Sequence, residues 1–296
     1  MKELPTGTLI LIIVLAVIVL AVVLISVWAF IEPHILDVST VRLRPAGKEP
    51  GFKKVPASSS PSDKPGLRLF FFSDLHAELC MIKPDRLVSA IREAHKNAPL
   101  DAVVFGGDIC NSYDHKEKGL SYLNRISDVC SELGIPFYGV TGNHDLEFDP
   151  SDRKCHFESI ENKMIDFASH TTGKRIILCG TDDSGRKKRV WNKVPPVPAD
   201  CVSVLVAHNP DSILHFEKDE HVDFMLSGHF HGGQLKLPFH LEFVKLRSGE
   251  LPRQEVIEGV FEHKGISFFI TRGLGCNALP IRLRSIPEAS VVEFYI

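Results

Sequence analysis

The chain has 296 residues, of which 44% are hydrophobic and 24% are charged, and its formal net charge is −3. These proportions are those of a globular protein and argue against an intrinsically disordered chain. Without bulk positive charge, no nucleic-acid partner is expected. The seven cysteines are scattered without a Cys-x-x-Cys pair, which argues against a structural zinc knuckle and favours a reducing compartment over a disulfide framework.

The first expected element is a long apolar helix. The run from Leu9 to Ile31 holds no charged residue and, as a helix, is long enough to cross the roughly 30 Å core of a bilayer. We therefore predict that residues 1–33 form a single-pass transmembrane anchor in contact with membrane lipids. A cleaved signal peptide is the alternative, but the run is long for such a peptide and is preceded only by Lys2, offset by Glu3.

The segment after this helix predicts its orientation. Arg42, Arg44 and Lys48 follow the apolar run, whereas Lys2 and the terminal amine precede it. By the positive-inside rule this bias favours a cell-membrane protein with its catalytic part on the cytoplasmic face. Residues 34–66 are expected to contain a leading strand at 35–43 and then a flexible linker rich in proline, glycine and serine.

From residue 67 to residue 296 the pattern predicts one folded domain, in which apolar β-type runs alternate with amphipathic stretches. Strands are expected at 67–72, 101–105, 136–140, 176–179, 202–207, 222–226, 266–270 and 291–296. Helices are expected at 85–96, 120–133 and 155–170. Such alternation predicts an α/β fold with covered sheets, whose ligands bind beyond the carboxyl ends of the strands.

Five polar motifs follow different apolar runs of this domain. They are Asp74-x-His76, Gly-Asp108, Gly-Asn143-His144-Asp145, His208 and Gly-His229-x-His231. Each motif alone is weak, because an Asp-x-His triplet or a Gly-Asn pair is usually only a surface turn. All five in one chain, each at the end of a predicted strand, are difficult to explain as unrelated turns and point to one shared site.

These motifs resemble those of the calcineurin-like metallophosphoesterase family, over about residues 67–296 and with no ligand position substituted. The resemblance implies a four-layer α/β/β/α sandwich with a two-metal centre. It implies a first metal held by Asp74, His76 and His231, a second held by Asn143, His208 and His229, and a bridging Asp108. It also implies that His144 faces the substrate phosphate and protonates the leaving oxygen, while Asp145 orients His144 or a ligand imidazole.

The residue types suit this chemistry. Carboxylate, imidazole and amide oxygens bind divalent cations of the Mn, Fe and Zn type, and Mn is the preferred expectation here. Two such ions activate a water molecule for attack on phosphorus, so no protein nucleophile is needed. Accordingly the chain shows neither a Gly-x-Ser-x-Gly elbow nor a phosphate-binding glycine loop followed by lysine.

Two further segments, 228–234 and 271–282, resemble a membrane-anchored bacterial branch of the family. That branch includes enzymes that cleave UDP-2,3-diacylglucosamine and phosphodiesterases of unsettled substrate. A lipid-linked phosphodiester or pyrophosphate is therefore the first substrate hypothesis. A broad phosphodiesterase or phosphatase of soluble or envelope phosphoesters is the second, and an inert metal-binding scaffold is the third. Arg272 and Arg282 are candidates for contact with a phosphate or a lipid head group. The alternative, which we weigh equally, is that both are solvated arginines on the surface.

Overall fold

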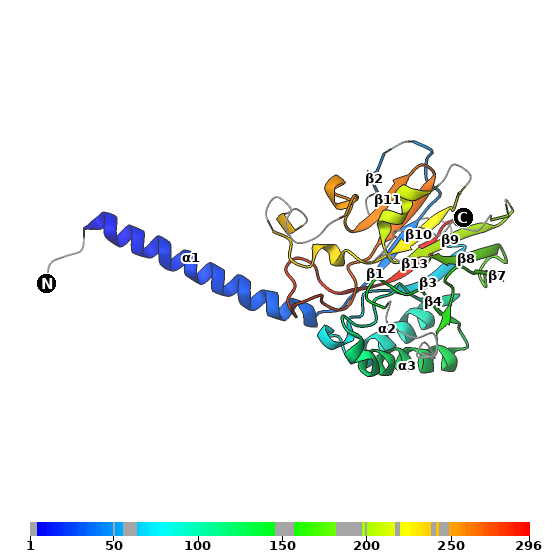
Figure 1. The fold of residues 1–296 in the computed structure, drawn as a ribbon, viewed down its shortest axis with the longest axis horizontal. Helices are drawn as coiled ribbons and strands as arrows, with labels where there is room; N and C mark the ends of the chain where they lie inside the picture. The colour runs from blue at the N-terminus through cyan, green and yellow to red at the C-terminus, as the bar shows by residue number, and fades with distance from the viewer. Residues whose placement is uncertain are drawn as a thin grey trace.

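The computed structural model describes residues 5–49, 51–55, 64–145, 157–181, 197–198, 200–216, 220–237, 241–242 and 249–296. Two mixed β-sheets lie face to face, and one long helix, α1 (Thr6–Ile31), projects away from them (Figure 1). This is the expected α/β fold with an apolar N-terminal helix.

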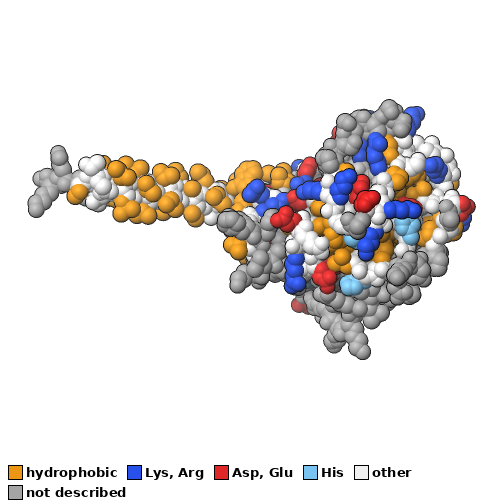
Figure 2. Space-filling model, turned by 90° about the horizontal axis from the view of Figure 1, so that it is seen from above, with side chains coloured by type: hydrophobic (Ala, Val, Ile, Leu, Met, Phe, Trp, Pro, Cys, Tyr) orange, Lys and Arg blue, Asp and Glu red, His pale blue; other side chains and the backbone are white. Residues whose placement is uncertain are grey.

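Helix α1 exposes almost all of its side chains. Figure 2 shows it as a hydrophobic rod, and within it only Ala29 is buried. The helix is long and apolar enough to cross a membrane, although a signal sequence shares those properties. The chain enters the folded domain at the 3-10 helix η1 (Glu32–His34), which directly follows α1 and in which Glu32 and Pro33 are buried.

The first sheet has the strand order β1-β13-β3-β4-β5-β6. Its strands are β1 (Asp37–Leu43), β13 (Glu288–Phe294), β3 (Leu67–Phe72), β4 (Ala102–Phe105), β5 (Phe137–Gly139) and β6 (Glu158–Ser159). Strands β3, β4 and β5 are mutually parallel, so their carboxyl ends meet at one edge. Helices α2 (Pro84–Asn97) and α3 (Lys116–Leu133) cover one face of this sheet and confirm two of the expected helices.

The second sheet has the order β2-β11-β12-β10-β9-β8-β7. Its strands are β2 (Lys53–Lys54), β11 (Gly259–His263), β12 (Ile266–Ile270), β10 (Phe224–Ser227), β9 (Val202–Ala207), β8 (Arg175–Thr181) and β7 (Met164–Ala168). Strands β8, β9, β10 and β12 run parallel. Its outer face packs against the 3-10 helices η4 (Pro210–His215) and η7 (Pro252–Gln254) and the residues that follow them.

The core between the two sheets is aromatic and aliphatic. Phe71 and Phe269 meet edge to face with their ring centroids 6.4 Å apart, and Phe224 meets Phe294 in the same way at 5.1 Å. Strands β3, β4 and β10 are buried along their whole length, as expected for strands covered on both faces. This double burial holds the strand ends, and hence the motifs that follow them, in fixed positions.

The expected helix at 155–170 is wrong over residues 157–170, which form β6 and the edge strand β7. In β7 the half-buried Ile165 and Phe167 alternate with exposed neighbours, which is the period of a strand with one covered face. The division at residue 67 stays a prediction, although β1 pairs with β13 along seven residues across it. The serine-rich part of the expected linker lies outside the described residues.

Candidate metal centre

The five motifs lie at neighbouring strand ends, as the alternation of strands and helices predicts. Asp74 and His76 follow β3, Asp108 follows β4, and His208 follows β9. His229 and His231 come after β10, and His231 begins the 3-10 helix η5 (His231–Gly233). Because the two sheets face each other, the motifs from both converge at one edge.

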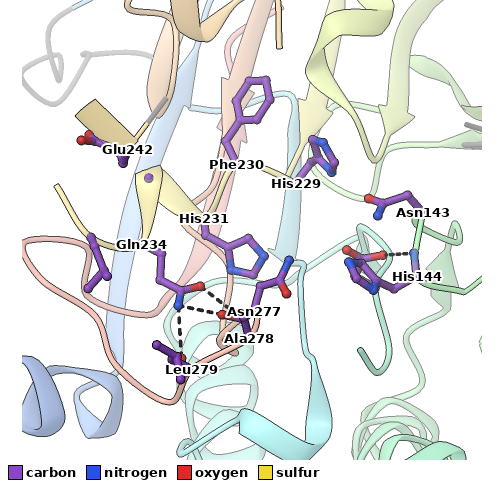
Figure 3. A pocket seen from close by; sticks show the side chains of 13 residues that line it. Asn143, His144, His229, Phe230, His231, Gln234, Glu242, Asn277, Ala278 and Leu279 are labelled. Atoms are coloured by element: carbon purple, nitrogen blue, oxygen red, sulfur yellow. Dashed lines mark hydrogen bonds between the residues drawn. The ribbon is translucent and has the colours of Figure 1, made fainter. Parts of the chain in front are cut away.

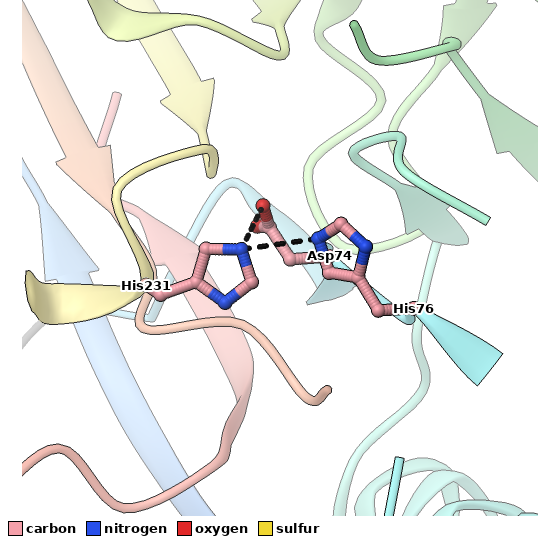
Figure 4. Close-up of side chains that lie close together, drawn as sticks. All are labelled: Asp74, His76 and His231. Carbon is pink, nitrogen blue, oxygen red and sulfur yellow. Dashed lines mark hydrogen bonds and ion pairs between the residues drawn. The ribbon is translucent and has the colours of Figure 1, made fainter. Parts of the chain in front are cut away.

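Asp74, His76 and His231 form the first group of potential metal ligands (Figure 4). The Nε2 atoms of His76 and His231 lie 3.1 Å apart, and His231 Nε2 is 3.3 Å from Asp74 Oδ1. All three side chains are buried. The backbone amide of His229 donates to Asp74, at 2.9 Å to Oδ1, which holds that carboxylate in place.

Asp108, His208 and His229 form the second group. His208 Nε2 lies 3.2 Å from Asp108 Oδ2 and 3.3 Å from His229 Nδ1. The same Asp108 oxygen is 3.4 Å from His76 Nε2, in the first group. One carboxylate oxygen is therefore within ligand spacing of both groups, which is the geometry of a bridging ligand.

The spacing and the tautomers fit metal ions. Around a cation with ligand bonds of about 2.0–2.2 Å, adjacent donor atoms lie roughly 3.0–3.5 Å apart. The Nδ1 of His208 lies 2.7 Å from the carbonyl oxygen of Gly106, and that of His231 lies 3.3 Å from the carbonyl oxygen of Gly275. When Nδ1 donates its proton to a carbonyl, Nε2 is unprotonated, and an unprotonated ring nitrogen is the form that binds a metal.

Asn143 adds a further donor. Its side-chain oxygen is buried and has no hydrogen-bond partner among the described residues. A buried amide oxygen without a donor is costly, and a cation would satisfy it. Asn143 lines the same cavity as Asp108 and His229. The residues present thus fit the two divalent metals that the clusters suggest.

The backbone at the ligands is unusual. Five of the seven expected ligands have positive φ angles: Asp74 (53°), His76 (39°), Asp108 (61°), His229 (70°) and His231 (52°). Such conformations cost about 1 kcal/mol or more for residues other than glycine and concentrate at functional sites. The turns are also tightly packed, because a Cβ on Gly142 would lie 2.2 Å from Asp108 Oδ1 and one on Gly228 would lie 2.2 Å from Asp74 Oδ2.

His144 lies beside both groups without belonging to either. Its backbone amide donates to Asp108 Oδ1 at 2.9 Å, and its Nδ1 lies 3.2 Å from the carbonyl oxygen of Asn111. Its ring meets that of His76 edge to face, with centroids 5.1 Å apart. Nδ1 is thereby occupied, and the side chain lines the same cavity as Asp108.

Asp145 supports the backbone beside the ligands. Its oxygens accept the backbone amides of Asp108 and Ile109 at 2.8 Å and that of Gly142 at 2.9 Å. These contacts give it a direct structural role, and orientation of His144 or a ligand ring by Asp145 stays a prediction. A carboxylate can accept several hydrogen bonds at once, and Asp145 thereby joins the turn that carries Asp108 to the turn that carries Asn143.

Carboxylates dominate the electrostatics. Burial raises the pKa of Asp74, and burial together with Asp108 raises the pKa of Asp145 to about 7. Burial also opposes ionisation of Asp108, but His208 and the other imidazoles nearby hold the pKa of Asp108 below its usual value. Buried acids crowded against one another in this way make a site that favours cations.

A cavity of about 530 Å³ opens beside the two groups (Figure 3). Asn143 and His144 lie on one side of it, and Gln234 and Leu279 lie on the other. Gln234 donates to the carbonyl oxygens of Asn277 and Leu279. Asn277 and Glu242 also line the cavity and were not identified from sequence, because neither belongs to a recognisable motif.

The two arginines lie outside the lining of this cavity. Arg282 is fully buried and donates to backbone carbonyls, so it is neither the surface residue nor the substrate contact that were expected. Arg272 is paired with Asp37 at 2.5 Å and Glu288 at 3.2 Å. Substrate contact by Arg272 stays a prediction.

Comparison with known proteins agrees with this geometry. The model of the calcineurin-like phosphoesterase family matches residues 67–233. An uncharacterized metallophosphoesterase of Bacillus subtilis, YkoQ, is 30% identical over 76% of this chain and 82% of its own length. The Escherichia coli phosphodiesterase YaeI is 28% identical, over 76% and 81% of the two chains. The UDP-2,3-diacylglucosamine pyrophosphatase LpxG of Chlamydia muridarum is 25% identical, over 77% and 83%.

The matched region contains the motifs from Asp74 to His231, and the ligand groups converge at its strand ends. The chain therefore belongs to the calcineurin-like phosphoesterase family and is a hydrolase that acts on phosphoester bonds.

Proposed function

We propose that this hydrolase is anchored in the membrane by α1 and cleaves a lipid-linked phosphodiester or pyrophosphate, such as UDP-2,3-diacylglucosamine, with two manganese ions. The observation that carries the proposal is the lining of the cavity. It includes Asp108 of the ligand groups and the exposed Leu279, and the loop that holds Leu279 continues to Arg282, whose amide donates to the carbonyl of Ala29 in α1.

The ligand assignment is part of the proposal. Asp74, His76 and His231 would hold one ion, Asn143, His208 and His229 the other, and Asp108 both. When bound, the ions lower the pKa of a water molecule and neutralise charge on the phosphoryl oxygens. Manganese suits a donor set that mixes carboxylate, amide oxygen and imidazole, with iron or zinc as alternatives.

The chain's own residues complete the reaction. His144 would bind a phosphoryl oxygen and then protonate the leaving oxygen through Nε2, because Nδ1 is held by the carbonyl of Asn111. Gln234 fixes the loop of Asn277 and Leu279, which forms the opposite wall. The exposed side chain of Leu279 gives this wall an apolar rim suited to an acyl chain.

The relatives support this substrate class without deciding it, because one is named for a lipid-linked pyrophosphate and another as a phosphodiesterase. The test is turnover of UDP-2,3-diacylglucosamine and of a soluble aryl phosphodiester by the manganese-loaded protein, with Asp108→Ala as the inactive control. We expect the acylated substrate to be preferred. Equal turnover of soluble substrates would favour the broad phosphodiesterase instead, and no turnover of either would contradict the proposal.

The membrane assignment has its own support and test. Ala29 and Glu32 accept backbone amides of the folded domain, those of Arg282 and Arg284, so cleavage before this segment would separate α1 from contacts that a signal peptide does not make. Basic residues after the helix favour a cytoplasmic catalytic domain. We expect the protein to stay in the membrane after alkaline washing and to resist protease added to intact spheroplasts. Digestion there would contradict the orientation, and release by the wash would contradict the anchor.

A further inference from the structure

The end of α1 is attached to the domain by a buried carboxylate. Glu32 is only 1% exposed. Its Oε2 accepts the indole N–H of Trp28 at 2.8 Å and the backbone amide of Arg284 at 2.9 Å, and its Oε1 accepts the backbone amide of Ser285. A buried carboxylate is tolerated only when donors satisfy it, and here these donors come from both sides of the junction.

The turn that Glu32 holds is the one that supports His231. Ser285 Oγ donates to the backbone carbonyl of His231 at 2.6 Å. The guanidinium of Arg282 donates to the carbonyl of Gly275, which is also within 3.3 Å of His231 Nδ1. The turn therefore fixes both the backbone and the ring of this ligand.

Arg282 strengthens this link. It is completely buried, and it also donates to the carbonyls of Arg272 (2.9 Å), Gly273 (3.2 Å) and Ser285 (2.8 Å). Its own backbone amide donates to Ala29 in α1 at 3.0 Å. The planar guanidinium thus joins the loop after β12 to the turn at 282–285, and the backbone amide of the same residue joins this turn to the end of α1.

We propose that Glu32 is a positioning residue for His231, so that the end of the anchor helix is part of the framework of the metal centre. The inference rests on the proposed metal centre, and it assigns α1 a role beyond location. Partners that orient a metal-ligating histidine typically contribute about 10–100-fold to metal affinity. Glu32 acts through the turn at 282–285, and its loss should weaken the first group, of Asp74, His76 and His231.

The test compares two buried carboxylates in the full-length protein in detergent. Glu32→Gln keeps the side-chain volume but places an amide donor against a backbone amide. Asp101→Asn is the matched control, because Asp101 is also buried and accepts two backbone amides, those of Arg68 and His170, at 2.8 Å. We expect Glu32→Gln to weaken one of two Mn²⁺ sites about 10–100-fold and to abolish the spin coupling of the two ions in electron paramagnetic resonance.

Asp101→Asn should keep both ions and their coupling. The inference is overturned if Glu32→Gln binds both ions as the wild type does, or loses no more than Asp101→Asn. If Glu32→Gln does not fold, Ser285→Ala decides, because it removes only the hydroxyl that supports the carbonyl of His231, and wild-type affinity in that variant overturns the inference. A wild-type protein that binds no manganese contradicts the proposed function itself, so the two failures are distinct.

Discussion

The backbone amide of Asp108 donates to the carboxylate of Asp145 across 2.8 Å. The same carboxylate accepts the amide of Gly142, so it joins the two turns that carry Asp108 and Asn143. Backbone contacts thus hold the residues of the candidate metal centre in place, and these supports can be tested separately.

We expect Asp145→Asn to destabilise the fold by about 1–3 kcal/mol, because an amide N–H would face a backbone donor. Metal affinity should fall as well, since Asp108 is displaced. Asp211→Asn is the matched control: Asp211 is buried and accepts the amides of Glu250 and Leu251 at 2.9 Å, in the outer layer of the second sheet. Thermal unfolding and metal titration of both variants check this. Wild-type metal affinity in Asp145→Asn would show that the support is dispensable.

His144→Asn should lower kcat by about 10²–10⁴-fold while the metal content stays unchanged, because the ring is proposed to protonate the leaving oxygen and belongs to neither ligand group. The loss should shrink with a nitrophenyl ester, whose leaving oxygen needs no proton. Kinetics and elemental analysis measure both effects, with the exposed His170→Asn as the control. Loss of a metal ion from His144→Asn would contradict the assigned role.

Gly142→Ala should disrupt the centre by overpacking. The added methyl group would lie 2.2 Å from Asp108 Oδ1, and a clash of this kind costs about 1–3 kcal/mol. Gly47→Ala is the control, because nothing lies within 4 Å of a Cβ at that position. We expect metal binding to weaken in Gly142→Ala alone. Equal metal affinities in the two variants would mean that the turn relaxes around the methyl group.

The buried cysteines should be unreactive. Burial raises the pKa of Cys110, Cys130 and Cys179 to about 12. Because a raised pKa favours the neutral thiol, roughly one molecule in 10⁴ carries the thiolate at pH 8. Iodoacetamide should therefore label these sites slowly in the native protein and fully after denaturation, as mass spectrometry can show. Rapid native labelling would contradict the packing of these residues.

Much of the fold can be predicted from residue patterns, because strands that are covered on both faces appear in the sequence as continuous apolar runs. Leu67–Phe72 and Val202–Ala207 were predicted with the observed bounds, and the motif after each run lies at the site. Helix and strand are harder to separate at an edge. The residues of β7 alternate with a period of two, but the short, half-polar segment also suits one face of a helix.

Parts of the site could not be predicted, because they depend on burial. An arginine solvated by backbone carbonyls and a surface arginine are identical in sequence, so the position of Arg282 beneath His231 had no signal. The attachment of Glu32 to the domain had only a weak signal in the sequence, which is a carboxylate four residues after Trp28 at the end of an apolar helix. Contacts between Glu32 and Ser285 join distant parts of the chain, and periodicity says nothing about such contacts.

The proposed metal centre requires two cations that share Asp108. The most direct test is titration of the metal-free protein with Mn²⁺, followed by electron paramagnetic resonance. We predict two ions for each chain with an exchange-coupled spectrum, and loss of that coupling in Asp108→Asn. A single bound ion, or two ions without coupling in the wild type, would contradict the shared-carboxylate centre.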